Sequence, residues 1–147
     1  MTSRNYSDLI AWQKAMDLAE STYKVTKSLP REEMYGLTSQ MRRAAVSIPS
    51  NIAEGQGRRK DGNFLHALLI AYGSLTELET QVILAKRLQF ISDAESRTFL
   101  RECGEVGRFP LAPLSRFTGR AHFYVTLLAV CSELISHGMP NWSTSTP

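Results

Sequence analysis

The basic residues between positions 42 and 60 carry the clearest chemical signal in the sequence. This segment reads RRAAVSIPSNIAEGQGRRK, with Arg42 and Arg43 at one end and Arg58, Arg59 and Lys60 at the other. Because arginine offers paired donors to phosphate, such a cluster suits the binding of a nucleic-acid backbone. Steps of 15 and 16 residues are near whole turns of a helix, so we expect both ends on nearly one side. The competing interpretation pairs Arg42 or Arg43 with acidic residues of a neighbouring helix or subunit.

The same segment contains polar groups from which a hydrolase site could be built. Such a site would need Ser47 or Ser50 as the nucleophile, with Glu54 and a histidine beside it. Of the three histidines only His66 falls within the expected helices, and no carboxylate stands at a spacing that would orient it. Neither a glycine-rich phosphate loop nor a metal-ligand spacing is present. The sequence therefore predicts a protein that is not an enzyme, with no catalytic residue, no metal site and no cofactor.

Pro49 interrupts a pattern that otherwise indicates one continuous helix. Proline removes a backbone donor and crowds the carbonyl four residues earlier. Ile48 and Ile52 nevertheless lie four residues apart, so the apolar seam continues across the proline and predicts a kinked helix. The polar side chains near the kink are predicted to have structural roles, as partners of freed backbone groups or, for the last of them, of Arg58. They are Ser47, Ser50, Asn51 and Glu54.

Apolar residues at alternating steps of three and four divide the chain into four expected helices. Their approximate ranges are residues 8–29, 32–56, 61–89 and 92–106. Ser7 is predicted to cap the first helix, and Ser92 with Glu95 matches a capping box at the start of the fourth. Connections this short favour antiparallel neighbours. The predicted fold is therefore all-α, an up-down antiparallel four-helix bundle over residues 1–108.

The large aromatic side chains are expected in the core. Trp12 and Tyr23 lie on the apolar seam of the first expected helix, and Tyr72 lies near that of the third. Met34 opens the seam of the second helix.

No aromatic residue is interleaved with the basic residues at 42–60, so the sequence does not indicate a sequence-specific reader of single strands.

The sequence changes character after Arg108. The segment FPLAPLSRFTGR contains two prolines and one glycine and is expected to end the fourth helix. Beyond it, AHFYVTLLAVCSELISHG is apolar on all sides and predicts one extra helix, followed by a mobile polar tail. Residues 109–147 are thus an atypical C-terminal extension. It is either a genuine extension that caps the bundle or mediates assembly, or a frame-shifted tail.

Composition excludes several classes of protein. With 147 residues, 43% of them hydrophobic, the chain can bury the core of one domain. Cys103 and Cys131 form no disulfide framework, and the N-terminus lacks the layout of a signal peptide. The longest apolar run is far shorter than the ~20 residues of a membrane span. A soluble, cytoplasmic protein without membrane contact is expected, and its net charge of +3 is concentrated in the first sixty residues.

Three stretches of the sequence together resemble a known family. They occur in the order DLIAWQKAMDLAESTYKVTKSLP, EMYGLTSQMRRAAVSIPSNIAEGQGR and FLHALLIAYGSLTELETQV. The chain is similar over residues 5–108 to the bacterial four-helix bundle protein family, also called the 23S rRNA intervening-sequence protein family. The relatives of that family include the accessory protein of diversity-generating retroelements. The chain departs from the family pattern after residue 108.

The resemblance implies a small bundle without enzymatic activity, which in some members assembles as a pentameric ring or barrel with a basic surface. Some members are encoded inside insertions in 23S rRNA genes. The retroelement relative binds its reverse transcriptase and nucleic acid through basic residues. The positions here that match the basic motif are Arg42, Arg43 and Arg58, and Arg59 and Lys60 extend its charge.

Two functional hypotheses follow. The first is a non-catalytic homo-oligomer, a pentamer by resemblance, that binds nucleic acid, and RNA in particular, through a basic face of the second helix. Its partners would be its own copies, the RNA, and a reverse transcriptase or another protein. The alternative is a protein-interaction scaffold in which the same arginines serve subunit or partner contacts without nucleic acid.

Overall fold

The structure, a computed structural model, describes residues 5–58 and 61–114. Two short 3₁₀ helices are present, η1 (Tyr6–Asp8) and η2 (Arg31–Met34). The four long helices are α1 (Ile10–Val25), α2 (Leu37–Arg58), α3 (Asp61–Arg87) and α4 (Asp93–Leu114). The chain divides into two compact units, Met1–Pro110 and Leu111–Pro147.

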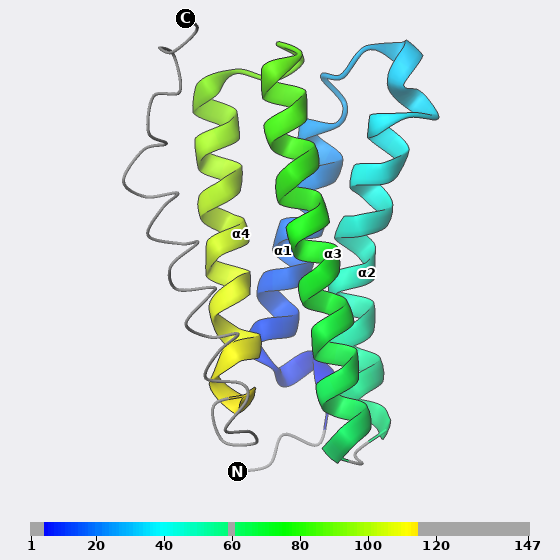
Figure 1. The fold of residues 1–147 in the computed structure, drawn as a ribbon, viewed down its shortest axis with the longest axis vertical. Helices are drawn as coiled ribbons and strands as arrows, with labels where there is room; N and C mark the ends of the chain where they lie inside the picture. The colour runs from blue at the N-terminus through cyan, green and yellow to red at the C-terminus, as the bar shows by residue number, and fades with distance from the viewer. Residues whose placement is uncertain (1–4, 59–60, 115–147) are drawn as a thin grey trace, which may run out of the picture. The chain divides into compact units, whose positions relative to one another are not determined.

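Within the first unit the four long helices run up and down beside one another (Figure 1). Helix α2 packs against both α1 and α3. Two ion pairs connect α4 to its neighbours: Lys14 Nζ lies 3.0 Å from Glu105 Oε2, and Lys86 Nζ lies 2.7 Å from Asp93 Oδ1. The described residues contain no strand, and the predicted all-α, up-down four-helix bundle is confirmed.

The core is formed by apolar side chains at helical spacing. In α2 the predicted seam is confirmed from Leu37 to Ile52, and Met41 and Ile48 between them are almost completely buried. The other three helices supply Leu18, Leu78, Val82, Phe99 and Val106, among others. This seam fixes which side of α2 faces inward and therefore which side chains of α2 remain available at the surface.

The buried side of α1 differs from the predicted one. Its buried residues are Ala15, Leu18, Ala19 and Thr22, whereas Tyr23 is 45% exposed, so the expectation that Tyr23 packs in the core is wrong. Two stripes of similar spacing run along this helix. The stripe with small residues faces the core, because small side chains let packed helices approach closely. The Thr22 hydroxyl is satisfied there by donating to the Leu18 carbonyl at 2.8 Å.

Two helix starts also differ from the prediction. The N-cap position of α1 is Leu9 and has no side-chain hydrogen bond, so Ser7 is not the cap of this helix. Ser7 instead lies in η1, where Asn5 Oδ1 accepts a hydrogen bond from Ser7 N at 3.2 Å. Helix α2 begins at Leu37, later than predicted, because Glu33 Oε2 accepts a hydrogen bond from Leu37 N at 2.9 Å. Gly36 leaves room for this carboxylate, since an added Cβ would lie 2.6 Å from Glu33 Oε2.

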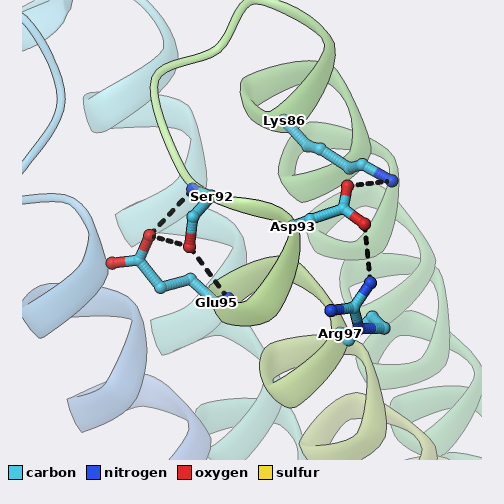
Figure 2. A network of polar contacts seen from close by, with 5 residues as sticks. All are labelled: Lys86, Ser92, Asp93, Glu95 and Arg97. Atoms are coloured by element: carbon cyan, nitrogen blue, oxygen red, sulfur yellow. Dashed lines mark hydrogen bonds and ion pairs between the residues drawn. The ribbon is translucent and has the colours of Figure 1, made fainter.

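The predicted capping box at the start of α4 is present (Figure 2). Ser92 N donates to Glu95 Oε2 at 2.8 Å, and Glu95 N donates to the Ser92 hydroxyl at 3.2 Å. Asp93 bridges Lys86 Nζ at 2.7 Å and Arg97 Nη1 at 2.6 Å. These contacts satisfy the first backbone donors of α4 and connect it to the end of α3.

The end of α4 contradicts the expected break after Arg108. The helix continues to Leu114 through Pro110 and Pro113. Proline already holds a helical φ angle, and each proline here removes one N–H donor close to the end of the helix. Residues 115–147, which include the whole of the expected extra helix and its tail, lie outside the described residues. None of the described helices has the length and apolarity needed to cross a membrane.

Candidate nucleic-acid interface

Helix α2 continues through Pro49, and nearby polar side chains bond to its backbone. The Ser50 hydroxyl donates to the Val46 carbonyl at 2.8 Å, and Asn51 Nδ2 donates to the Ser47 carbonyl at 2.8 Å. Both carbonyls follow that of Ala45, which is the one that Pro49 leaves without its helical donor, so these side chains bond to the backbone beside the freed group and not to the group itself. The hydroxyls of Ser47 and Ser74 lie 2.8 Å apart, which adds a polar contact between α2 and α3.

Arg42 is fixed against α1. Its Nε donates to the hydroxyl of Thr26 at 2.9 Å, and its guanidinium carbon lies 4.9 Å from the centroid of the Tyr23 ring. Thr26 is itself buried, and its hydroxyl donates to the Tyr23 carbonyl at 3.3 Å. Neither of these Arg42 contacts involves a carboxylate of a neighbouring helix, which the competing interpretation would require. The positive charge is therefore held in place by a neutral hydroxyl and an aromatic face.

Arg43 extends the positive charge outward from the same turn of α2. It is exposed, and the described residues offer it no hydrogen bond or ion pair. Lys24 and Lys27, near the end of α1, are exposed as well. They line a hollow that shares Tyr23 with the hollow lined by the two arginines. Tyr23 thus lines one hollow together with two arginines and another together with Lys24, Lys27 and Glu20. The two lysines were not part of the sequence-based site.

Arg58 lies at the far end of α2. Sixteen residues separate it from Arg42, which places it roughly 24 Å along the axis and about 160° around it. Arg58 forms an ion pair with Glu54, with 2.6 Å between Nη2 and Oε1. The fifteen residues between Arg43 and Arg58 correspond to about 60° around the same axis, so the expectation of one basic side stays a prediction. Arg59 and Lys60 lie outside the described residues.

Aromatic side chains do accompany the arginines, contrary to the sequence-based expectation. Tyr35, at the end of η2, is 95% exposed and lines the same hollow as Tyr23, Met34, Arg42 and Arg43. Met34 is 49% exposed and lies outside α2, so its predicted place in the apolar seam is wrong. Tertiary packing brings these residues together. The sequence signal that could have revealed Tyr35 is Gly36, which marks the break before α2.

The groove that Lys24 and Lys27 line runs between α1 and α2, and most of its other lining residues are apolar. The rings of Tyr6 and Trp12 meet edge to face at 5.4 Å at one part of it. Its lining is largely apolar and includes Tyr6, Trp12, Met16, Val46, Pro49 and Ala53. Trp12 is half-buried, as is Tyr72 on α3, so both contribute to the core less than expected. The groove meets the basic hollow at Tyr23 and Val46.

Other reactive side chains are not arranged for chemistry at this face. Burial, followed by the nearby charges of Glu79 and Glu102, raises the pKa of the Cys103 thiol, which disfavours the reactive thiolate. Burial also raises the pKa of the Glu79 carboxyl. His66 is exposed. Among the described residues no group of three His, Cys, Asp or Glu side chains is placed to hold a metal ion.

The fold and this surface define a small up-down helical bundle with a basic and aromatic hollow at one end of its α1–α2 face. The family model of the 23S rRNA-intervening sequence proteins matches residues 7–110, and the chain belongs to this family. The resemblance found in the three sequence stretches is thereby confirmed. The matched range ends at the last residue of the first compact unit.

A solved structure supports the same fold. It is the crystal structure of a protein of unknown function from the S23 ribosomal protein family of Bacteroides thetaiotaomicron. The two chains align with a TM-score of 0.65 and 21% sequence identity, over 70% of this chain and 96% of that one. No curated protein matches the sequence.

Proposed function

We propose that this protein is a non-catalytic, oligomeric helical bundle of the cytoplasm that binds nucleic acid, and specifically RNA. The observation that carries the proposal is Arg42, whose guanidinium is fixed by Thr26 and Tyr23 beside the exposed Arg43. A positioned arginine loses less conformational freedom when a phosphate binds. The name of the family refers to 23S rRNA, which supports RNA over DNA as the ligand.

The charges around the hollow favour an anionic backbone. The described residues that line it include Arg42 and Arg43 and no carboxylate. Lys24 and Lys27 line the adjoining groove together with one carboxylate, that of Glu20. When several such cations bind phosphates, they release the counterions condensed on the nucleic acid. This release is the main source of affinity for nucleic acids. Arg58, with Arg59 and Lys60, is proposed as a second and weaker contact, because Glu54 offsets part of its charge.

The contacts near Pro49 support a structural role for the groups that a hydrolase would need. The Ser50 hydroxyl donates to the backbone of its own helix, and Asn51 bonds to the carbonyl and hydroxyl of Ser47. A nucleophilic serine instead needs a base within hydrogen-bond reach. The carboxylate of Glu54 is engaged by Arg58. These contacts support the non-catalytic part of the proposal.

Two exposed apolar surfaces support self-association. One is the α1–α2 groove, which is lined by Trp12 and Met16 among others. The other is carried by α3, where Leu69, Ile70 and Leu84 are exposed. Two different surfaces on one chain permit head-to-tail contacts, which close into a ring when the rotation allows. The proposed assembly is a homo-oligomer, and a pentamer if it follows the members that form five-membered rings.

The test is RNA binding measured by fluorescence anisotropy with a short labelled RNA. The double variant Arg42→Ala/Arg43→Ala is expected to bind at least about tenfold more weakly than the wild type, since it loses two charge-assisted phosphate contacts. The control is Arg97→Ala/Arg101→Ala, which removes the same charge from exposed positions of α4. Equal affinity of the first variant and the wild type would remove the proposal.

A protein-interaction scaffold is a second candidate function, because the basic hollow and the α1–α2 groove share Tyr23 and Val46. In that case the arginines would contact a subunit, a reverse transcriptase or another protein. Light scattering separates the two functions. The scaffold predicts that Arg42→Ala/Arg43→Ala changes the mass of the assembly and that the wild type binds no RNA.

A further inference from the structure

We propose that Tyr35 is a stacking platform for an unpaired base of the bound RNA, with Arg42 and Arg43 holding the adjoining phosphates. This inference rests on the proposed function and names the form of RNA that the site prefers, a single-stranded segment. Base stacking on aromatic rings and phosphate contacts from a basic groove are the two elements of single-strand binding.

The first support is the exposure of Tyr35. At 95% it is the most exposed of the large hydrophobic side chains described, and the next, Ile10, is 59% exposed. Both faces of the ring are therefore open to a planar ligand. A tyrosine left this open in the free protein gains the most when a base covers it, because nearly all of its apolar area is still in water.

The second support is the rigid backbone on either side of Tyr35. Gly36 N donates to the Glu33 carbonyl at 3.0 Å, and Leu37 N donates to Glu33 Oε2 at 2.9 Å. Gln40 N in turn donates to the Gly36 carbonyl at 3.2 Å, which joins this turn to the first turn of α2. The Tyr35 side chain is thus presented from a fixed turn, and ordering it on a base costs little backbone entropy.

The third support is the composition of the hollow beside the ring. Arg42 and Arg43 supply charge, Tyr23 supplies a second ring that already carries the Arg42 guanidinium, and Ser39 adds a hydroxyl. In a paired duplex the bases are stacked on one another, and an aromatic ring cannot reach their faces. The ring beside the phosphate-binding groups therefore favours unpaired RNA. A protein partner would instead have to place carboxylates opposite both arginines to balance their charge.

The test compares two ligands and three forms of the full chain. The ligands are a fluorescent short oligouridylate and a blunt RNA duplex of the same length. The proteins are the wild type, Tyr35→Leu and Tyr35→Phe. Tyr35→Leu is expected to lose about 5- to 150-fold in affinity for the single strand, the equivalent of the 1–3 kcal/mol of one base–aromatic stack. Its affinity for the duplex and its salt dependence should stay at the wild-type values, and Tyr35→Phe should bind like the wild type.

A second measurement is ultraviolet crosslinking of the wild type to the oligouridylate, followed by mass spectrometry of peptides. The expected crosslinked peptide contains Tyr35. If Tyr35→Leu binds the single strand as tightly as the wild type, the stacking inference is wrong while RNA binding stands. If Tyr35→Leu instead changes the mass of the assembly at unchanged RNA affinity, Tyr35 is a subunit contact and the inference is overturned. If the wild type binds neither ligand, the proposed function itself fails.

Discussion

At the scale of single residues, the functional argument depends on how Arg42 is held. The Thr26 hydroxyl accepts from Arg42 Nε at 2.9 Å, and the Tyr23 ring lies under the guanidinium at 4.9 Å. Residues 5–58 and 61–114 offer the terminal nitrogens of this guanidinium no hydrogen bond, so these nitrogens can form paired hydrogen bonds to a phosphate. Thr26 therefore contributes to binding in our proposal although it need not touch the RNA.

This role of Thr26 predicts the effect of Thr26→Val. Valine keeps the buried shape and removes the acceptor, so Arg42 gains rotameric freedom that must be lost again on binding. We expect RNA affinity to fall about two- to tenfold, which corresponds to ordering one long side chain. Thr22→Val is the matched control, because Thr22 is equally buried and its hydroxyl donates only to the Leu18 carbonyl. Equal affinities of the two variants, measured by anisotropy, would contradict this role.

At the scale of elements, sequence periodicity predicted α2 well and α1 poorly. One stripe dominates in α2, so the seam from Leu37 to Ile52 is fixed despite Pro49. In α1 two stripes have similar spacing, and only packing against the other helices selects the one with Ala15 and Leu18. The same tertiary packing brings Tyr23 to Arg42.

The candidate site could likewise be predicted from the sequence only in part. Its arginines could be predicted from charge and from the resemblance to the family. The aromatic part of the site could not, because Tyr35 depends on the break at Gly36 and on the carboxylate cap supplied by Glu33. A sequence pattern read as one helix from residue 32 conceals that break.

The capping box of α4 gives a stability prediction at this scale. Ser92→Ala should lower the free energy of unfolding by about 1 kcal/mol, the usual cost of a lost cap. The hydrogen bonds from Ser92 lower the pKa of the Glu95 carboxyl, and the hydrogen bond and charge of Lys86 lower that of Asp93. Both groups bind a proton more readily in the unfolded chain. Their stabilising effect is therefore fully present above the pKa values of the unfolded chain and is lost as the pH falls through the lower folded-state pKa values.

Urea unfolding at several pH values tests this prediction. The difference in stability between the wild type and Glu95→Ala should be largest near neutral pH and should shrink as the pH falls through the lowered pKa of the Glu95 carboxyl. Thr98→Ala, at an exposed position of the same helix, is the control. A difference that stays constant from neutral to acid pH would show that the Glu95 carboxylate does not stabilise the helix start.

At the scale of the whole molecule, several weak sites can act together. In a ring each subunit presents one hollow, so a flexible RNA bound at one subunit meets the next at a high effective concentration. The apolar α1–α2 groove and the exposed apolar residues of α3 are the surfaces proposed to hold such a ring together.

Met16→Glu tests the proposed subunit contact at a residue that does not line the hollow of Arg42 and Arg43. Met16 lines the groove and is partly exposed, so a carboxylate there should disturb a subunit contact without unfolding the helix. We expect light scattering to show a smaller particle and RNA affinity to fall through lost avidity. Thr98→Glu adds the same charge to the exposed surface of α4 and should leave the mass unchanged. An unaltered mass for Met16→Glu would place the interface elsewhere.

The central claim is that Arg42 and Arg43 bind phosphates, and the salt dependence of RNA binding tests it most directly. On single-stranded RNA each neutralised phosphate contributes about 0.7 to the slope of log K against log salt concentration. The slope for Arg42→Ala/Arg43→Ala should therefore be shallower than that of the wild type by about 1.4. The Arg97→Ala/Arg101→Ala control should keep the wild-type slope. If the Arg42→Ala/Arg43→Ala variant also kept that slope, its arginines would not contact the backbone, and the claim would be contradicted.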